Sequence, residues 1–203
     1  MCGIVGWIDW KDDLAHQEAT IERMVKTLRP RGPDAQGQWL SPYAALAHRR
    51  LIVIDPQTGE QPMVYREGDN TYTITYNGEI YNFHELRHEL ERYGHTFRTR
   101  SDTEVILHAY AKWGEACVER LNGIFAFGIW DEQKQQLLLA RDHLGVKPLF
   151  YAQRGGGILF ASELKALLAH PLVKAEVDAA GLAEVLSAVR TPGSGIYRDV
   201  HEL

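Results

Sequence analysis

The order of the expected secondary-structure elements constrains the fold of this 203-residue chain more than any other feature. Apolar runs rich in β-branched and aromatic residues, which are typical of strands, recur between residues 3 and 76 and again between residues 124 and 161, and helical spacing dominates the segment between these two parts. Two mainly antiparallel sheets with helices packed outside would bury the apolar faces of such a chain. We therefore expect an α+β domain built in layers.

The expected elements are read from apolar spacing and from turn residues. Strands are expected at residues 3–9, 38–40, 43–49, 71–76, 124–130, 136–141, 149–153 and 158–161. Helices are expected from Ile21 to the residue before Pro30, and at residues 83–93, 101–113, 115–121, 163–169 and 179–188. Residues 51–54 form a further apolar run, whereas residues 57–63 are polar and irregular.

The character of the chain changes after Pro171. Residues 191–195 combine threonine, proline, glycine and serine, as in a flexible joint, and residues 196–203 follow neither a helix nor a strand pattern. We expect a domain at residues 2–178, followed by an edge or linker at residues 179–203 that leads to a further domain outside this chain.

Composition excludes several classes of protein. The hydrophobic fraction of 45% suffices for a core, and the net charge of -5 comes without a basic stripe, which argues against nucleic-acid binding. Two cysteines give neither a disulfide framework nor a Cys-x-x-Cys pair. No apolar run reaches about 18 residues and no signal-peptide pattern is present, so we expect a cytoplasmic protein without membrane contact. The sequence leaves the assembly open, a homodimer included.

Cys2 occupies an unusual position for a thiol. An initiator methionine before a small residue is normally removed, which would leave Cys2 with a free α-amino group. In unperturbed peptides a thiol has a pKa of about 8.5 and an α-amine one of about 7.7 to 8.0, so one residue would carry a nucleophile and a base. The alternative is an incidental cysteine at a disordered end, although the apolar residues from Ile4 onward predict a buried strand.

Other polar residues also have more than one interpretation. Asn77-Gly78 would usually form a hairpin turn, but the helical spacing that follows predicts a link from strand to helix. Asp102, like Ser101, could simply cap a helix. His84 and His88 lack a third ligand nearby, so we expect no metal site. Cys117 is expected to be an ordinary buried thiol.

Six motifs stand in order along the chain. They are Cys2-Gly3-Ile4-Val5-Gly6, Arg31-Gly32-Pro33-Asp34, His48-Arg49-Arg50-Leu51, Asn77-Gly78-Glu79-Ile80-Tyr81-Asn82, Ser101-Asp102-Thr103-Glu104 and Arg141-Asp142-His143-Leu144-Gly145. With these motifs the chain resembles, from residue 2 to about residue 170, the class II glutamine amidotransferases, and within them it is most similar to the glutaminase half of glutamine-dependent asparagine synthetases. The resemblance implies an αββα sandwich of the N-terminal-nucleophile hydrolase type.

The resemblance also implies roles for individual residues. Cys2 matches the nucleophile, with its α-amine as general base and acid, and Asn77 with Gly78 matches the pair that binds the oxyanion. Asp102 matches the acid that holds the substrate ammonium, and Arg50 the arginine that binds its carboxylate, although Arg49 beside it leaves the register open. The remaining pocket residues are expected to be Val53, Ile54 and Glu79, and Arg141-Asp142-His143 is expected to shape a turn near the sheet.

By this resemblance, the domain at residues 2–178 hydrolyses L-glutamine to L-glutamate and ammonia without a cofactor. A C-terminal synthetase domain, which would use ATP and magnesium, would receive the ammonia. One alternative is an amidotransferase half that serves another acceptor. Another is a silent regulatory module, which would have no reason to keep Cys2, Arg50, Asn77, Gly78 and Asp102 together.

Overall fold

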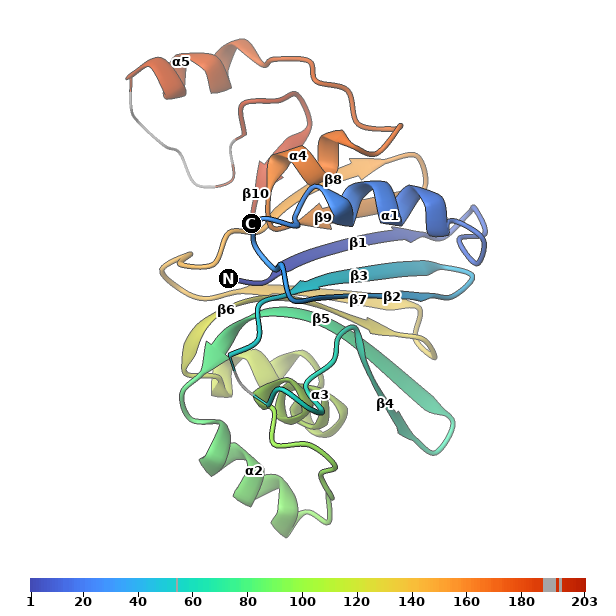
Figure 1. Cartoon of the computed structure of the whole chain (residues 1–203), viewed down its shortest axis with the longest axis vertical. Coiled ribbons are helices and arrows are strands. Elements are labelled where there is room, and N and C mark those ends of the chain that lie inside the picture. The colour runs from blue at the N-terminus through green and yellow to red at the C-terminus, as the bar shows by residue number, and fades with distance from the viewer. Residues whose placement is uncertain (54, 188–192, 194) are drawn as a thin grey trace.

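Two β-sheets lie face to face, with helices on their outer faces (Figure 1). The computed structural model describes residues 1–53, 55–187, 193 and 195–203. Its strands are β1 (Gly3–Asp9), β2 (Ala35–Leu40), β3 (Ala44–Arg50), β4 (Met63–Glu67), β5 (Asn70–Ile80), β6 (Gly123–Asp131), β7 (Gln136–Arg141), β8 (Phe150–Arg154), β9 (Gly157–Ala161) and β10 (Val200–Glu202). Its helices are α1 (Glu18–Lys26), α2 (Phe83–Arg92), α3 (Asp102–Trp113), the 3-10 helix η1 (Gly114–Arg120), α4 (Leu164–Leu168) and α5 (Ala179–Ser187).

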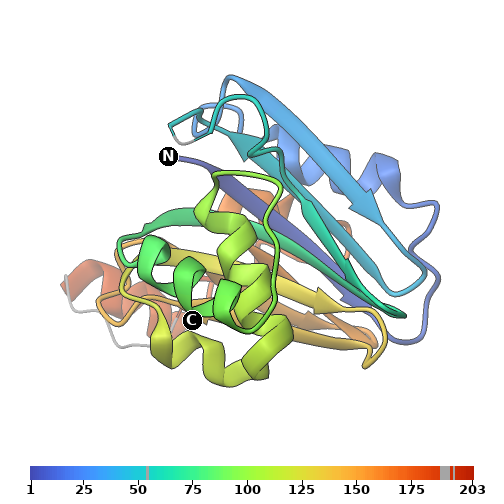
Figure 2. The same cartoon turned by 90° about the horizontal axis from the view of Figure 1, so that it is seen from below.

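Every pairing between these strands is antiparallel. One sheet has six strands in the order β10-β8-β9-β1-β3-β2, and the other has four in the order β4-β5-β6-β7. Helices α1 and α4 cover the outer face of the larger sheet, and α2 and α3 cover that of the smaller one, as Figure 2 shows from below. The layered α+β domain and its αββα order are therefore confirmed.

Strand β1 is buried along its whole length because both of its faces are covered. Ile4 and Ile8 point into the cluster between the sheets, and Val5 and Trp7 point toward α1 and α4. Between them, Gly6 lets the Phe160 ring approach, since a Cβ there would lie 2.1 Å from that ring. This strand therefore anchors the N-terminal end of the chain in the centre of the molecule.

Several expected elements differ from the observed ones. Strand β4 begins at Met63, inside a segment expected to be irregular, and β10 lies in an end where no strand was expected. Strand β5 runs through Asn77-Gly78 and ends at Ile80, so the expected link from strand to helix at that pair is wrong. Of the expected joint at residues 191–195, residues 191, 192 and 194 lie outside the described residues, as does Ala188 at the expected end of α5. No helix in the described part of the chain is long and apolar enough to cross a membrane.

Candidate active site

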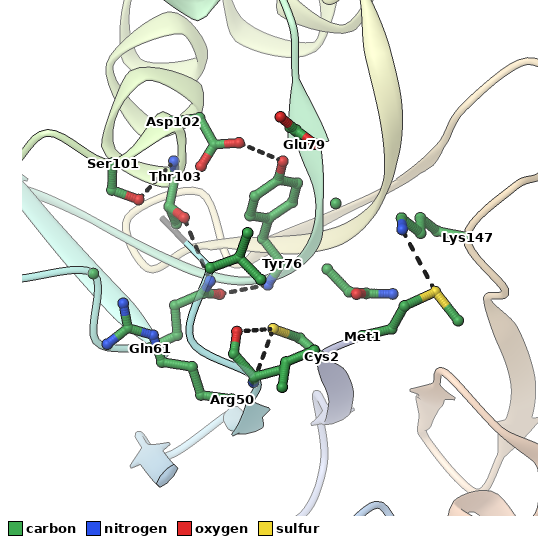
Figure 3. Close-up of a pocket in the computed structure, with 15 residues that line it drawn as sticks. Met1, Cys2, Arg50, Gln61, Tyr76, Glu79, Ser101, Asp102, Thr103 and Lys147 are labelled. Atoms are coloured by element: carbon green, nitrogen blue, oxygen red, sulfur yellow. Dashed lines mark hydrogen bonds between the residues drawn. The ribbon is translucent and has the colours of Figure 1, made fainter. Parts of the chain in front are cut away.

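A cavity of about 180 Å³ brings together residues from five distant parts of the chain (Figure 3). Its lining comprises Met1, Cys2, Arg50, Leu51, Val53, Gly59, Gln61, Tyr76, Asn77, Gly78, Glu79, Ser101, Asp102, Thr103 and Lys147. This set contains the residues expected at the site, with one exception: Ile54 lies outside the described residues. The chemistry that this cavity allows depends on the direction in which each of these side chains points.

Cys2 precedes β1 and is held on two sides. Its sulfur accepts a hydrogen bond from the Leu51 N–H at 3.4 Å and lies 3.6 Å from the Leu51 carbonyl oxygen. Its carbonyl oxygen accepts a hydrogen bond from Arg31 Nε at 2.8 Å, and Arg31 also pairs with Glu163 at 3.0 Å. Cys2 is therefore not an incidental cysteine at a disordered end.

The α-nitrogen of Cys2 is joined to Met1 in the 203-residue sequence. Met1 is 54% exposed, and its sulfur lies 3.5 Å from Lys147 Nζ at the edge of the cavity (Figure 3). An amide nitrogen is not basic, so Cys2 can supply a base of its own only after Met1 has been removed.

Asn77 carries an unsatisfied donor. Its side chain is 2% exposed, and Nδ2 has no hydrogen-bond partner within the described residues. A buried polar group left unpaired costs about 1–3 kcal/mol, so a ligand atom that accepts from this amide would explain it. The amide lies in the same cavity as the Cys2 thiol.

Gly78 follows Asn77 in the middle of a strand pairing. It lies opposite Phe125 of β6, and a Cβ at this position would lie 2.4 Å from the Ile124 carbonyl oxygen and 2.8 Å from the Tyr76 ring. A residue other than glycine would therefore push the two strands apart. The Asn-Gly pair serves close packing here, not a hairpin.

The register of β3 determines which of the two neighbouring arginines, Arg49 or Arg50, lines the cavity. Arg50 lines the cavity, is 6% exposed, and donates hydrogen bonds to the carbonyl oxygens of Asp55 at 2.5 Å and Pro56 at 3.4 Å. Successive side chains on a strand face opposite ways. Arg49 accordingly points away and donates to Gly32 O at 2.9 Å and to Gln36 Oε1 at 2.8 Å.

Asp102 is the first residue of α3, and Ser101 provides the N-cap by accepting a hydrogen bond from the Thr103 N–H at 3.1 Å. Asp102 Oδ2 accepts from the Tyr76 hydroxyl at 2.7 Å and from the Ile80 N–H at 3.1 Å. Burial raises the pKa of Asp102, and these two donors partly oppose that rise. The carboxylate is thus buried in the cavity, and not needed as a cap.

Val53 and Glu79 both lie on the exposed side of the cavity. Val53 is 74% exposed and Glu79 is also exposed. They border the space that the buried groups surround.

Several lining residues were not expected from the sequence, notably Gln61, Tyr76 and Lys147. Gln61 Oε1 accepts from the Tyr76 N–H at 2.7 Å, which ties the loop before β4 to β5. The sequence does offer a clue to Lys147, because this residue comes shortly after the motif Arg141-Asp142-His143. Gln61 and Tyr76 belong to none of the motifs that pointed to the site.

The turn that carries Lys147 is shaped by Asp142, as the resemblance implied. The Asp142 carboxylate accepts hydrogen bonds from the backbone N–H groups of Phe125, Leu144, Val146 and Lys147. Burial alone would raise the pKa of Asp142, but these donors outweigh it and hold the pKa below its usual range. Arg141 also bonds the Lys147 carbonyl oxygen at 2.7 Å.

The remaining thiol and histidines lie outside the cavity. Cys117 is fully buried, as expected, and burial raises its pKa to about 12. His84 and His88 are both exposed. Among the described residues there is no group of three histidine, cysteine or acidic side chains that could hold a metal ion.

Known proteins with a similar sequence are asparagine synthetases. The chain is 51% identical, over its full length, to asparagine synthetase [glutamine-hydrolyzing] 3 of Bacillus subtilis, and covers 33% of that protein. It is 44% identical to asparagine synthetase [glutamine-hydrolyzing] 1 of the same organism over 83% of this chain and 27% of that protein. The chain thus spans about a third or less of the relatives it matches.

Solved structures share the fold. A glutamine phosphoribosylpyrophosphate amidotransferase from B. subtilis superposes with a TM-score of 0.67 and 23% identity over 82% of this chain and 43% of that one. An allosteric regulatory enzyme of purine biosynthesis gives a TM-score of 0.69, also with 23% identity, over 83% of this chain and 43% of that one. The fold is therefore that of the N-terminal-nucleophile amidotransferases. The family model described as "glutamine amidotransferase domain" matches residues 1–203, so the chain belongs to that family.

Proposed function

We propose that this chain is a glutaminase, which hydrolyses L-glutamine to L-glutamate and ammonia once Met1 has been removed. The observation that carries the proposal is the composition of one cavity. It combines the Cys2 thiol, the unpaired Asn77 amide, the Arg50 guanidinium and the Asp102 carboxylate. Glutamine carries a side-chain amide carbonyl, which suits both the thiol and the amide donor, a carboxylate, which suits the guanidinium, and an ammonium, which suits the carboxylate.

In the first half of the reaction, Cys2 Sγ attacks the side-chain carbonyl carbon of glutamine and a C–S bond forms. The α-amine of Cys2 takes the thiol proton and transfers it to the amide nitrogen, which leaves as ammonia when the C–N bond breaks. The negative oxygen of the tetrahedral intermediate would accept hydrogen bonds from Asn77 Nδ2 and the Gly78 N–H. The product at this stage is a thioester on Cys2.

In the second half, water attacks the thioester carbonyl and the α-amine of Cys2 accepts a proton from it. The C–S bond breaks, the protonated α-amine returns its proton to the sulfur to restore the thiol, and glutamate leaves. Because the base belongs to the same residue as the nucleophile, no separate basic side chain has to be held in position for either step.

Substrate recognition would use the two buried charged side chains. Arg50 presents a planar guanidinium, which suits the α-carboxylate, and Asp102 presents a carboxylate to the α-ammonium. Val53 and Glu79, on the exposed side, would border the bound glutamine. These roles follow the family resemblance and agree with the positions of the side chains in the cavity.

We further infer that the ammonia serves a C-terminal synthetase domain that makes asparagine. The relatives that are 51% and 44% identical are glutamine-hydrolysing asparagine synthetases about three times as long as this chain or longer. ATP and magnesium would be needed only in that further domain. A cytoplasmic location belongs to the same proposal.

The test is to incubate the chain with L-glutamine and to measure glutamate and ammonia, with mass spectrometry to establish that the protein begins at Cys2. Cys2→Ala should abolish both products, whereas Cys117→Ala, the matched change at the other cysteine, should retain turnover. Asn77→Ala should lower kcat by about 100- to 1,000-fold, the usual effect of losing one oxyanion donor. A correctly processed protein that makes no glutamate would overturn the proposal.

A further inference from the structure

Tyr76 lies where three parts of the chain meet at the cavity. It is 3% exposed and immediately precedes Asn77 in β5. Its carbonyl oxygen accepts a hydrogen bond from His48 Nε2 of β3 at 3.0 Å, and its N–H donates to Gln61 Oε1 at 2.7 Å. Its hydroxyl donates to Asp102 Oδ2 at 2.7 Å (Figure 3). The position of the ring is therefore fixed at both ends.

The hydroxyl of Tyr76 acts on the one carboxylate that is buried in the cavity. Asp102 is 3% exposed, and both the Tyr76 hydroxyl and the Ile80 N–H donate to the same oxygen, Oδ2. Two donors on one oxygen fix the rotation of the carboxylate about its last bond. The direction in which Asp102 meets a ligand therefore depends on Tyr76.

The hydroxyl also affects the charge of that carboxylate. Burial raises the pKa of Asp102, and the hydrogen bond from Tyr76 is the largest effect that opposes this rise. Burial, together with the neighbouring Asp102, raises the pKa of Tyr76 well above its usual value, so the phenol stays protonated and remains a donor.

The other titratable groups that line this cavity come from several elements. They are the α-amino group of the first residue, the Cys2 thiol before β1, Arg50 at the end of β3, Glu79 in β5 and Lys147 in the turn after β7. Ser101, the N-cap of α3, and Thr103 in its first turn are the neighbours of Asp102, and both are neutral. Tyr76 is thus a neutral donor that favours the charged form of Asp102 without adding a charge of its own.

We propose that Tyr76 is a positioning residue that selects substrates with an α-ammonium group, by orienting the Asp102 carboxylate. The inference rests on the proposed glutaminase function, because it assigns the ammonium of glutamine to Asp102. Tyr76 itself need not touch the reacting amide. Its effect should therefore appear in substrate affinity and not in the chemical steps.

The experiment compares Tyr76→Phe with the unmodified chain on two substrates. One is L-glutamine, and the other is glutaric acid monoamide, which has the same amide and carboxylate but lacks the α-ammonium. For glutamine, KM should rise roughly tenfold with kcat changed less than about threefold, because a hydrogen bond to a charged group is lost. For the monoamide, KM should stay the same. The acid limb of kcat/KM for glutamine should also move to higher pH.

Tyr72→Phe is the matched control, since it removes a hydroxyl from the same strand away from this cavity, and it should leave the preference for glutamine unchanged. If Tyr76→Phe does not fold, a ring-fluorinated tyrosine introduced at position 76 tests the same point. Its more acidic hydroxyl is a stronger donor and should move the acid limb to lower pH.

Two results would overturn the inference: equal changes in KM for both substrates in Tyr76→Phe, or no change in either. Each of these results is informative when the unmodified protein hydrolyses the substrates. Failure of that protein to hydrolyse either substrate would instead count against the glutaminase function.

Discussion

Acid should destabilise this protein partly through His48, which lies between the two sheets. His48 is 1% exposed in β3, and its Nε2–H donates to the Tyr76 carbonyl oxygen of β5 at 3.0 Å. Burial lowers the pKa of His48 to about 4, and the nearby Arg50 acts in the same direction. In the unfolded chain the imidazole returns to its ordinary pKa of about 6.5.

The size and sign of the effect follow from proton linkage. Between pH 6.5 and pH 4 the unfolded chain binds a proton at His48 that the folded chain does not, so stability falls as the pH falls through this window. With pKa values of about 4 when folded and 6.5 when unfolded, the free energy of unfolding should drop by about 2.5 kcal/mol between pH 7 and pH 4.5 on account of His48 alone. His108 and His170, whose pKa values burial also lowers to about 4, add to the total loss.

The variant His48→Gln isolates the part of this loss of stability that is due to His48, because glutamine does not titrate and keeps an amide donor for the Tyr76 carbonyl. Urea unfolding, followed by tryptophan fluorescence at pH 7 and pH 4.5, gives the free energy of unfolding of each protein. Between pH 7 and pH 4.5, the free energy of unfolding of the variant should fall by about 2.5 kcal/mol less than that of the unmodified chain. His16→Gln, a change at an exposed histidine, is the control and should lose as much as the unmodified chain. Equal losses in His48→Gln and the unmodified chain would refute the reasoning.

Three further perturbations test other parts of the structure. Because burial raises the pKa of Asp102, KM for glutamine should rise on acidification at a higher pH than an exposed aspartate would give; a flat KM between pH 4 and pH 7 would contradict this. Asp142→Asn should lower the free energy of unfolding by about 1–3 kcal/mol, measured with urea, because four backbone donors lose a charged acceptor. Gly78→Ala should cost about 3 kcal/mol, seen as a lower Tm, because the new Cβ would lie 2.4 Å from the Ile124 carbonyl oxygen.

The layered fold could be predicted because its central strands have strong local signals. Strand β1 is apolar throughout, since both of its faces are covered, and β5 and β6 are rich in β-branched and aromatic residues. Strands β4 and β10 were not predicted. Each lies at the edge of its sheet and pairs with a single neighbour, so the partner strand decides its conformation more than its own residues do.

The residues expected at the site came from motifs whose order matches a family, and the spacing of single residues would not have indicated them. The resemblance pointed to Arg50, but the neighbouring Arg49 left an ambiguity. In the structure Arg50 lines the cavity, and Arg49 bonds Gly32 and Gln36 instead. Tyr76 and Gln61 could not be predicted, because their importance comes from hydrogen bonds to residues 26 and 15 positions away. A contact between residues so far apart in the chain leaves no local pattern in the sequence.

The position of Met1 has a practical consequence for anyone who produces this protein. Met1 lies at the cavity, next to Lys147, while Arg31 holds the carbonyl of the following residue. An affinity tag fused before Cys2 would therefore extend from the edge of the cavity proposed for glutamine, and would keep the α-nitrogen in an amide. Purification should rely on a tag after Leu203, or on a protease that leaves cysteine as the first residue.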